Sequence, residues 1–446
     1  MLVRTLGLYC VLLISCLGRE ALSQDRSSIP SSVEIPKQIF DYMARPEPDF
    51  DWKLAETTAP FGQKIYRIEL TSQNWQNNVW KHSLVVYEPN ELKHKDHMLL
   101  FVTGGNNGSV LQPKDLLMGS MLANFCGARV ATLHQVPNQP LMDGRKEDDL
   151  ITETWLKFLE TKDATWPLLF PMVKSAVKAM DALESFSQDE FNQPLKGFVI
   201  SGASKRGWTS WLAPVVDKRI IATAPMVIDM LNFPVQMKKQ MENWGFYSEQ
   251  IADYTSKGLV TDDGVPRSGP EGDLWKMMDP YTYRLQLSLP KLLVVGANDP
   301  YWNVDAMSHY WPTLVGAKHI MRVPNAGHSL DAGREHAMRT VGVFYRHAVA
   351  SKSLPNLSWE PAVSEASVGL SLNSEPSPVE SRLWVAASDD NDFRDSKWIA
   401  HPLTASPSGF SGSAVRSGKQ RLAVFGEVDY EFEGLKYSLS TLVYWK

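Results

Sequence analysis

Residues 198–208 read FVISGASKRGW, and this stretch decides which fold the chain is expected to adopt. Its first four residues form an apolar strand, and large apolar residues then recur at helical spacing from 208 to 215. Ser204 therefore lies on a sharp turn between a strand and a helix. Such a turn lifts a serine hydroxyl above a sheet, with the amino end of the helix beneath it. The stretch predicts a nucleophile turn, although Arg206 takes the last place of the usual G-x-S-x-G pattern and a plain N-cap serine would also suit it.

Two later segments place an acid and a histidine just after apolar strands. Residues 292–295 (LLVV) lead to Asp299, and residues 319–323 lead to His328. Alone, Asp299 could cap the helix that starts near residue 303, and His328 could be a packed or capping histidine. The order serine, acid, histidine is that of α/β-hydrolases, so together the residues predict a triad of Ser204, Asp299 and His328.

The residue types suit acyl transfer. A serine hydroxyl becomes a nucleophile when a neutral imidazole takes its proton, and a carboxylate fixes the tautomer of that imidazole. The oxyanion needs donors, which we expect to be the backbone N–H of Lys205 and one from the glycine-rich loop 103–108, at Gly105 or Asn106. That loop could also suggest phosphate binding, but it contains neither G-x-G-x-x-G nor a Walker pattern.

Short apolar runs alternate with helical patterns from about residue 60 to residue 350. This alternation is typical of a sheet that is parallel in its centre and covered on both faces. The expected central strands are 98–102, 129–133, 198–201, 220–227, 292–295 and 319–323. Residues 64–70 and 80–87 alternate in polarity and indicate an antiparallel entry hairpin, and 171–183 has a helical face. The sequence predicts an α/β-hydrolase with a mostly parallel central sheet.

Two regions depart from this rhythm. The stretch at about 229–289 is rich in aromatic residues, methionine and glycine without a clear strand, which predicts a cap insertion over the site. Its aromatic residues either line a pocket or pack; they include Trp244, Phe246, Tyr247 and Trp275. Beyond residue 354, prolines punctuate short alternating runs, which predict a small C-terminal β-sandwich over 355–446, following a hydrolase domain over 24–354.

The first 23 residues read as a secretory signal peptide. A basic residue precedes an apolar run over 6–17, and Ala-Leu-Ser stands before Gln24, where the mature chain is expected to begin. The run is shorter than the roughly 20 apolar residues that span a bilayer, so no stable membrane span is expected. We predict a secreted or periplasmic protein. Residues 13–16 (LISC) also resemble a lipoprotein box, which would place a lipid on Cys16.

Composition excludes several classes of function. The chain has 45 Lys and Arg against 50 Asp and Glu, which offers no basic surface for nucleic acid. Only Cys126 remains after the presumed signal, and its apolar neighbours indicate a buried, inert thiol. The ten histidines form no H-E-x-x-H motif. We therefore expect neither a metal site nor a cofactor.

Two further features depend on the surroundings of the site. Asn107 and Asn356 stand in N-glycosylation sequons, and we predict that Asn107 is unmodified because a glycan would crowd the oxyanion loop. The cations that follow Ser204 have two interpretations: Arg206 pairs with an acid as scaffold, or Lys205 or Arg206 contacts a carboxylate on the substrate. We favour scaffold for Arg206, because the second residue after a nucleophile normally points into the fold.

Several blocks of sequence carry a family resemblance between about residues 40 and 350. They are LTSQNW (70–75), WKH (80–82), QVPNQP (135–140), Glu147-Asp148 before Thr154-Trp155, MVKSAV (172–177), GASKRGW (202–208) and VPNAGH (323–328). In these blocks the chain resembles the PhoPQ-activated pathogenicity-related family, PqaA type. The resemblance implies an α/β-hydrolase fold with Ser204 as nucleophile, Asp299 as acid and His328 as base. It makes Arg206 a family feature, whereas Asn106 departs from an expected serine.

Three functions follow from these patterns. The first is a secreted serine hydrolase, of esterase or peptidase type, that acts through a Ser-Asp-His triad and an acyl-enzyme on a small-molecule, ester or peptide substrate. The second is a non-catalytic extracellular factor that regulates growth, virulence or envelope resistance on a hydrolase fold. The third is an enzyme directed at a cell-wall or surface component, with the β-sandwich as binding module. The matched triad order favours the first.

Overall fold

The computed structural model describes residues 34–60, 62–407 and 409–446, and Pro36–Lys446 form one compact unit. The predicted signal peptide (1–23) and the lipoprotein alternative at Cys16 lie outside the described residues. Among the residues that are described, no helix is both long enough and apolar enough to cross a membrane.

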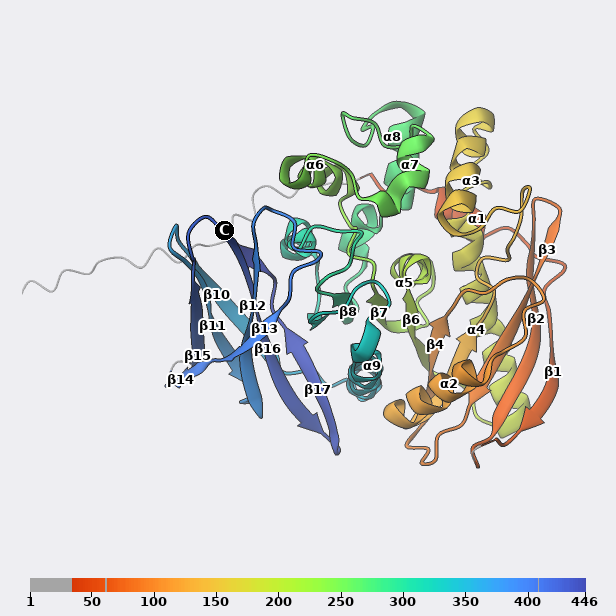
Figure 1. Ribbon diagram of the computed structural model, residues 1–446. Coiled ribbons are helices and arrows are strands. Elements are labelled where there is room, and N and C mark those ends of the chain that lie inside the picture. Colours follow the sequence, from red (N-terminus) through yellow and green to blue (C-terminus); the bar gives the residue numbers. More distant parts are fainter. Residues whose placement is uncertain (1–33, 61, 408) are drawn as a thin grey trace, which may run out of the picture. The chain divides into compact units, whose positions relative to one another are not determined.

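A large sheet runs through this unit (Figure 1). Within the described residues it has 14 strands, in the order β1-β2-β3-β5-β4-β6-β7-β8-β9-β17-β16-β12-β13, with β18 beside β16. Its first nine strands along the chain are β1 (Asp51–Thr58), β2 (Ile65–Trp75), β3 (Asn78–Tyr87), β4 (His94–Val102), β5 (Ala128–Leu133), β6 (Gly197–Ala203), β7 (Ile220–Met226), β8 (Lys291–Gly296) and β9 (Lys318–Val323). The run from β5 to β9 is parallel, and β1 to β3 are antiparallel.

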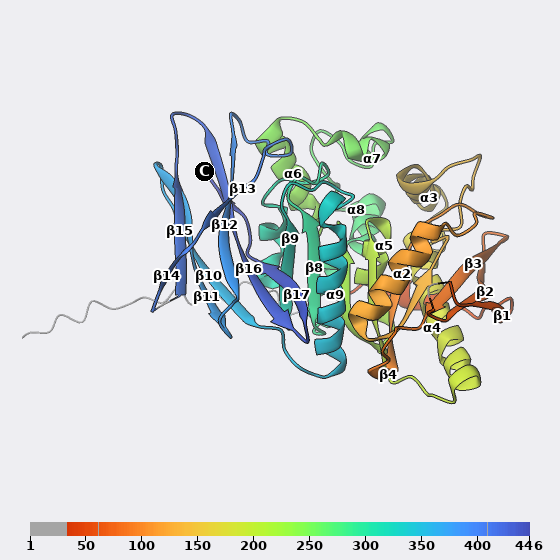
Figure 2. The same cartoon turned by 60° about the horizontal axis from the view of Figure 1, so that its bottom comes forward.

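Helices cover both faces of the parallel part. On one face α2 packs beside α9, which come forward in Figure 2, and on the other α4 packs beside α5. The helices of this part are α1 (Gln38–Met43), α2 (Pro113–Cys126), α3 (Glu147–Thr161), α4 (Leu169–Phe191), α5 (Lys205–Val216) and α9 (Arg334–Val349). Short 3₁₀ turns are η4 (Ala306–His309), η5 (Trp311–Thr313) and η6 (Asp331–Gly333). The predicted fold class, strands and entry hairpin are confirmed.

The predicted cap insertion is helical and contains no strand in the described residues. It contains α6 (Phe233–Trp244), η2 (Glu249–Ile251), α7 (Ala252–Ser256), α8 (Gly269–Met278) and η3 (Pro280–Gln286). In Figure 1 the helices α6, α7 and α8, drawn in green, gather at one end of the sheet. They lie between β7 and β8 in the chain, so the cap stands over the carboxyl ends of the central strands, where ligands bind in such sheets.

The tail forms two antiparallel layers. Its strands are β10 (Asn356–Val363), β11 (Ser367–Glu375), β12 (Glu380–Ser388), β13 (Ile399–Pro402), β14 (Thr404–Ser406), β15 (Gly409–Val415), β16 (Arg421–Phe432), β17 (Leu435–Ser440) and β18 (Tyr444–Trp445). One layer is the four-stranded sheet β10-β11-β15-β14. The other continues the central sheet, because β17 pairs with β9 through Ser440 and Ile320.

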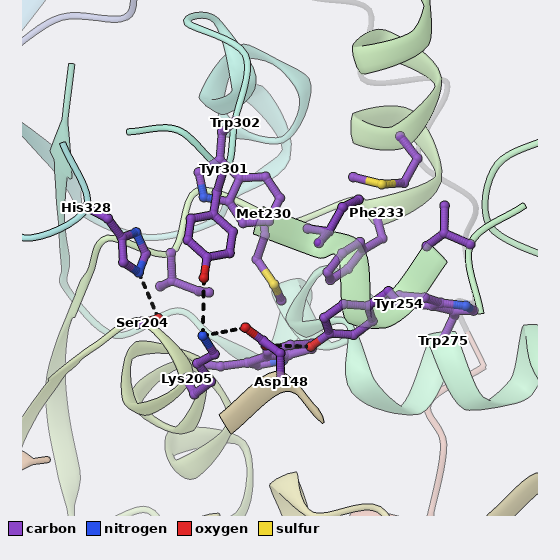
Figure 3. Close-up of a pocket in the computed structure, with 15 residues that line it drawn as sticks. Asp148, Ser204, Lys205, Met230, Phe233, Tyr254, Trp275, Tyr301, Trp302 and His328 are labelled. Carbon is purple, nitrogen blue, oxygen red and sulfur yellow. Dashed lines mark hydrogen bonds and ion pairs between the residues drawn. The ribbon is translucent and has the colours of Figure 1, made fainter. Parts of the chain in front are cut away.

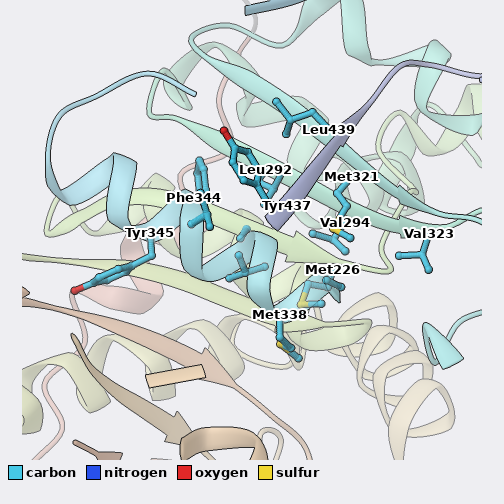
Figure 4. Close-up of a cluster of buried hydrophobic side chains, with 14 of the residues drawn as sticks. Met226, Leu292, Val294, Met321, Val323, Met338, Phe344, Tyr345, Tyr437 and Leu439 are labelled. Carbon is cyan, nitrogen blue, oxygen red and sulfur yellow. The ribbon is translucent and has the colours of Figure 1, made fainter. Parts of the chain in front are cut away.

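One hydrophobic core runs from the parallel sheet into the tail. Met338 and Phe344 of α9 share one buried cluster with Leu292 of β8, and Tyr437 and Leu439 of β17 belong to the same cluster (Figure 4). Cys126, at the end of α2, belongs to the same cluster and is free and buried. Burial raises the pKa of its thiol, in keeping with the inert role predicted for it.

Candidate active site

The turn between β6 and α5 presents Ser204. The residue has φ of 60° and ψ of −125°, a conformation that side chains rarely adopt, and its backbone N–H donates to the Met226 carbonyl at 2.9 Å. A Cβ on Gly202 would lie 2.7 Å from the Arg206 carbonyl oxygen, and one on Gly207 would lie 2.8 Å from Ile228. The turn therefore needs glycine at 202 and 207, and it leaves 206 free for a large residue.

The predicted acid and base meet the serine. His328 Nε2 lies 2.9 Å from Ser204 Oγ, and His328 Nδ1 lies 2.8 Å from Asp299 Oδ2. The second oxygen of Asp299 accepts the Tyr301 backbone N–H at 3.1 Å, which fixes the buried carboxylate. With the Nδ1 proton directed at the carboxylate, Nε2 is free to accept the serine proton. The three residues come from loops after β6, β8 and β9, so the structure brings them together as the sequence suggested.

A second carboxyl group lies at the end of the neighbouring strand β7. Asp229 is buried and accepts a hydrogen bond from the Tyr310 hydroxyl at 2.6 Å. Burial raises the pKa of Asp229 to about 6, against the opposing charge of Arg322. The histidine nevertheless bonds to Asp299, which identifies Asp299 as the acid of the hydrogen-bonded set.

The expected oxyanion donors lie around the same turn. Lys205 is the first residue of α5, so its N–H belongs to the helix end whose donors have no partner within the helix. Val102, at the end of β4, pairs with Gly202, so the loop that carries Gly105 and Asn106 leaves the sheet beside the nucleophile turn. Both residues are exposed, and neither lines the pocket described below. Their role as donors stays a prediction.

Arg206 pairs with an acid, as the scaffold interpretation predicts. Its guanidinium binds both Glu147 carboxylate oxygens at 2.7 Å, and its Nε donates to the Val136 carbonyl. Burial alone would raise the pKa of Glu147, but the hydrogen bonds and charge of Arg206 reverse this and hold it at about 2. A Cβ on Gly104 would lie 2.6 Å from Arg206, so the oxyanion loop packs directly on this side chain. Arg206 thus links the nucleophile turn to α3 and to the loop after β4.

Lys205 makes a second pair between the same two helices, within the pocket. Its Nζ lies 2.6 Å from Asp148 Oδ2 and 3.4 Å from the Tyr301 hydroxyl, while the Tyr254 hydroxyl donates to Asp148 Oδ1 at 3.1 Å (Figure 3). Burial alone would lower the pKa of Lys205, but the charge of Asp148 raises it above its ordinary value. The Lys205 ammonium is therefore already balanced by a carboxylate of this chain.

An apolar pocket opens beside Ser204 and His328 (Figure 3). Its cavity measures about 30 Å³, room for roughly two water molecules. Cap residues form about half of its wall, namely Met230, Phe233, Met237, Ile251, Tyr254, Val260 and Trp275. Of the aromatic residues singled out in the cap, Trp275 lines this pocket, whereas Trp244 stacks on Phe246 and the Tyr247 hydroxyl donates to the Thr261 carbonyl.

Sequence reasoning did not identify Tyr301, whose ring lies over the histidine. The Tyr301 and His328 ring centroids are 4.4 Å apart at an interplanar angle of 35°. An aromatic face in this position stabilises a cationic imidazolium. The signal was present in the sequence, since Tyr301 stands two residues after the acid and is placed by the turn at Asp299.

Two other predicted features can be located. Asn107 is exposed and its backbone N–H donates to the Gln139 carbonyl at 2.6 Å, and Asn356 is exposed at the start of β10, so glycosylation of either stays a prediction. Among the described residues, no group of three or more histidine, cysteine, aspartate or glutamate side chains is arranged to hold a metal ion.

The chain is similar to known proteins over most of its length. The model of the PhoPQ-activated pathogenicity-related protein family matches residues 39–394. Autocrine proliferation repressor protein A of Dictyostelium discoideum is 32% identical over 379 residues, which cover 80% of this chain and 76% of that protein.

Two acetyl xylan esterases of solved structure also align with the chain. The enzyme from Paenibacillus sp. R4 has 13% identity and a TM-score of 0.48, covering 69% of this chain and 92% of its own. The enzyme from Thermoanaerobacterium sp. JW/SL YS485 has 15% identity and a TM-score of 0.45, covering 70% and 96%.

Proposed function

The chain belongs to the PhoPQ-activated pathogenicity-related protein family, as its sequence blocks indicated, and we propose that it is a secreted serine hydrolase of ester or amide bonds. The observation that carries the proposal is the continuous hydrogen-bonded set from Ser204 through His328 to Asp299, with links of 2.9 and 2.8 Å. These side chains come from three strand ends, and Ser204 and His328 line the apolar pocket. Packing alone gives no reason for this order of groups.

In the acylation step, Ser204 Oγ attacks the substrate carbonyl carbon and His328 Nε2 takes the hydroxyl proton. The carbonyl π electrons move to oxygen, and the tetrahedral intermediate forms. Asp299 remains a carboxylate and stabilises the imidazolium. His328 then gives the proton to the leaving alcohol or amine as its bond to the carbonyl carbon breaks, which leaves an acyl group on Ser204.

In the deacylation step, water takes the place of the leaving group and the steps of acylation occur in reverse order. His328 takes a proton from water, the resulting oxygen attacks the acyl carbon, and the proton returns to Ser204 Oγ as the acid product departs. The backbone N–H of Lys205, with that of Gly105 or Asn106, holds the oxyanion in both steps. The Tyr301 ring supports the imidazolium that forms each time.

The pocket favours a compact, uncharged acyl group. Its cavity of about 30 Å³ is lined mainly by apolar side chains, and the Lys205 ammonium that faces it is already paired with Asp148. We expect kcat/KM for p-nitrophenyl acetate to exceed that for p-nitrophenyl octanoate by about tenfold or more, because each methylene that fails to fit costs about 1 kcal/mol. Met237→Ala should narrow this gap, whereas Met277→Ala, a buried methionine outside the pocket wall, should not. Equal rates for both esters in the unaltered chain would contradict this acyl preference.

The triad itself is tested by steady-state kinetics on p-nitrophenyl acetate with single and double variants. Ser204→Ala, His328→Ala and Asp299→Asn should each lower kcat by about 10³-fold or more. Ser204→Ala/His328→Ala should be no worse than either single variant, because the groups act as a unit. Ser329→Ala, an exposed serine beside the base, is the matched control and should keep its rate. Activity that survives Ser204→Ala would refute the proposal.

Secretion is the other part of the proposal, and it rests on the sequence of residues 1–23. Expression of the full chain in a secreting host, followed by amino-terminal sequencing, should find a mature protein that begins near Gln24. A lipid-modified Cys16 would instead leave the product in the detergent phase on partitioning.

A second candidate function is supported by the name of the 32% identical relative, a proliferation repressor. In this alternative the chain acts as an extracellular growth regulator that needs no chemistry. Purified Ser204→Ala protein distinguishes the two. Growth inhibition that persists without the hydroxyl would favour the regulator, and inhibition lost with the hydroxyl would favour the enzyme.

A further inference from the structure

A loop of the tail reaches the loops that carry the proposed acid and base. Residues 389–398, between β12 and β13, form this tail loop. Its Phe393 and Trp398 are buried in a cluster with Phe425 of the tail and with Ala297, two residues before Asp299. The tail loop is thus anchored in the C-terminal strands and packs against the loop that carries the acid.

Asn298, the residue before Asp299, is held by this loop. Its Nδ2 donates to the Ser396 carbonyl at 2.7 Å and to the Arg394 carbonyl at 2.9 Å. Its backbone N–H donates to the Ala326 carbonyl at 3.0 Å, in the loop that carries His328. Asn298 therefore joins the acid loop, the base loop and the tail loop at one point.

Asn325, three residues before His328, is held by the same loop. Its Nδ2 donates to the Trp398 carbonyl at 2.9 Å, and its Oδ1 accepts the Trp398 backbone N–H at 2.8 Å. Asn325 has φ of 54°, a left-handed conformation that asparagine tolerates better than most residues. Its side chain thus pairs with one backbone unit of the tail loop as a neighbouring strand would.

Arg394 extends these contacts to the cap. Its guanidinium donates to Glu249 at 3.1 Å and to the Pro300 carbonyl at 3.4 Å, and it lies 4.2 Å from the Trp244 ring centre. The cap adds its own bond to the acid loop, because the Gln240 amide donates to the Tyr301 carbonyl at 2.8 Å. The segment that follows Asp299 is therefore held between cap and tail.

We propose that the tail loop is a positioning element of the hydrolytic site, with Asn298 and Asn325 as the residues through which it aligns Asp299 and His328. The inference rests on the proposed function. It gives the C-terminal strands a part in catalysis in place of a separate binding role. Both asparagines lie within three residues of a triad member, so a change in their bonds can shift the side chain of the acid or the base. A shift of about 1 Å in a catalytic group can lower the rate about 100-fold.

The test uses the full chain with Asn325→Gly as the main variant, since glycine accepts positive φ and so only the side-chain bonds are lost. On p-nitrophenyl acetate we expect kcat to fall about 10- to 100-fold with KM within about twofold. Asn298→Ala should act in the same direction. Asn325→Asp keeps the acceptor for the Trp398 N–H and should be intermediate. Lys397→Ala, an exposed residue of the same loop, is the matched control and should keep its kcat.

A second measurement separates positioning from general destabilisation. The far-downfield proton resonance of the His328–Asp299 hydrogen bond should weaken or shift in Asn325→Gly while the urea midpoint changes little, because Asn325 is exposed. A folded Asn325→Gly protein with unchanged kcat and an unchanged resonance would overturn the inference. An unaltered chain without esterase activity would instead overturn the proposed function itself.

Discussion

The nucleophile turn and the loops of the acid and base are held in place by different means. Ser204 is fixed by its neighbours along the chain, since Gly202 and Gly207 let β6 and α5 pack without a gap. Asp299 and His328 lie on loops, and next to the base there is more space, because a Cβ on Gly327 would meet no atom closer than 3.7 Å. These loops are instead fixed by side-chain bonds to the tail and the cap.

Substitutions in the two regions should therefore have different effects. A change in the nucleophile turn should damage folding and activity together, because the turn belongs to the close-packed core. A change around the acid and base should damage activity with a small effect on stability.

Gly207→Ala and Gly327→Ala make the same substitution in the two regions. At 207 the new Cβ would lie 2.8 Å from Ile228 and from the Met226 carbonyl oxygen, so we expect a loss of about 3 kcal/mol in unfolding free energy and a large loss of esterase activity. At 327 we expect the unfolding free energy to fall by less than about 1 kcal/mol. Urea unfolding monitored by tryptophan fluorescence measures both. Equal losses at the two sites would remove the contrast.

Arg206→Met tests the ion pair that ties the nucleophile turn to Glu147 of α3. The substitution removes the bonds to Glu147 and to the Val136 carbonyl, and we expect the unfolding free energy to fall by about 2 to 3 kcal/mol. This loss is smaller than for a fully buried pair, because 40% of the Glu147 side chain is exposed. Arg145→Met, which removes a half-buried arginine just before α3 and its pair with Asp149, is the matched control, and we expect it to change the urea midpoint much less. A change no larger than that of the control would show that the pair does not support the turn.

The same pair gives a dependence on pH. The pKa of Glu147 is held at about 2, below its ordinary 4.5, so its contribution to stability is full above about pH 4.5 and is lost as pH falls towards 2. After solvent screening we expect the wild-type advantage over Glu147→Gln to shrink by about 1 to 2 kcal/mol between about pH 6 and about pH 3. Parallel urea titrations measure it, and a constant difference would contradict the assignment.

Tyr301→Leu tests the support of the base by its own loop. The ring lies 4.4 Å from that of His328, and loss of its interaction with the imidazolium should lower kcat for p-nitrophenyl acetate about two- to fivefold. Tyr301→Phe keeps the ring and loses only the 3.4 Å contact with Lys205, so its kcat should stay within about twofold. If Tyr301→Phe and Tyr301→Leu reduce kcat equally, the hydroxyl of Tyr301 and not its ring supports the base.

The same contrast explains which parts of the fold and the site could be predicted from the sequence alone. The nucleophile turn is local, so a strand, small residues and a helical pattern made Ser204 a candidate, and the acid and histidine that follow it favoured a nucleophile over a plain N-cap. Asp299 and His328 could be predicted because each directly follows an apolar strand and because their chain order is informative. The parallel sheet and the cap could be predicted from periodicity and its interruption.

What could not be predicted depends on contacts between distant segments. The Glu147-Asp148 block was visible, but its pairing with Arg206 and Lys205 spans more than fifty residues and carries no periodic signal. The partners of Asn298 and Asn325 lie in the tail, where no motif indicated a contact with the site. The pairing of β17 with β9 could not be predicted either, because the alternating pattern of a strand does not specify which strand pairs with it.

The most direct test of the central claim is mass spectrometry after treatment with a fluorophosphonate probe. We expect one adduct per folded chain, located on the peptide that contains Ser204 and absent from Ser204→Ala, while Ser329→Ala still reacts. A folded chain that stays unmodified, or an adduct on any other residue, would contradict it.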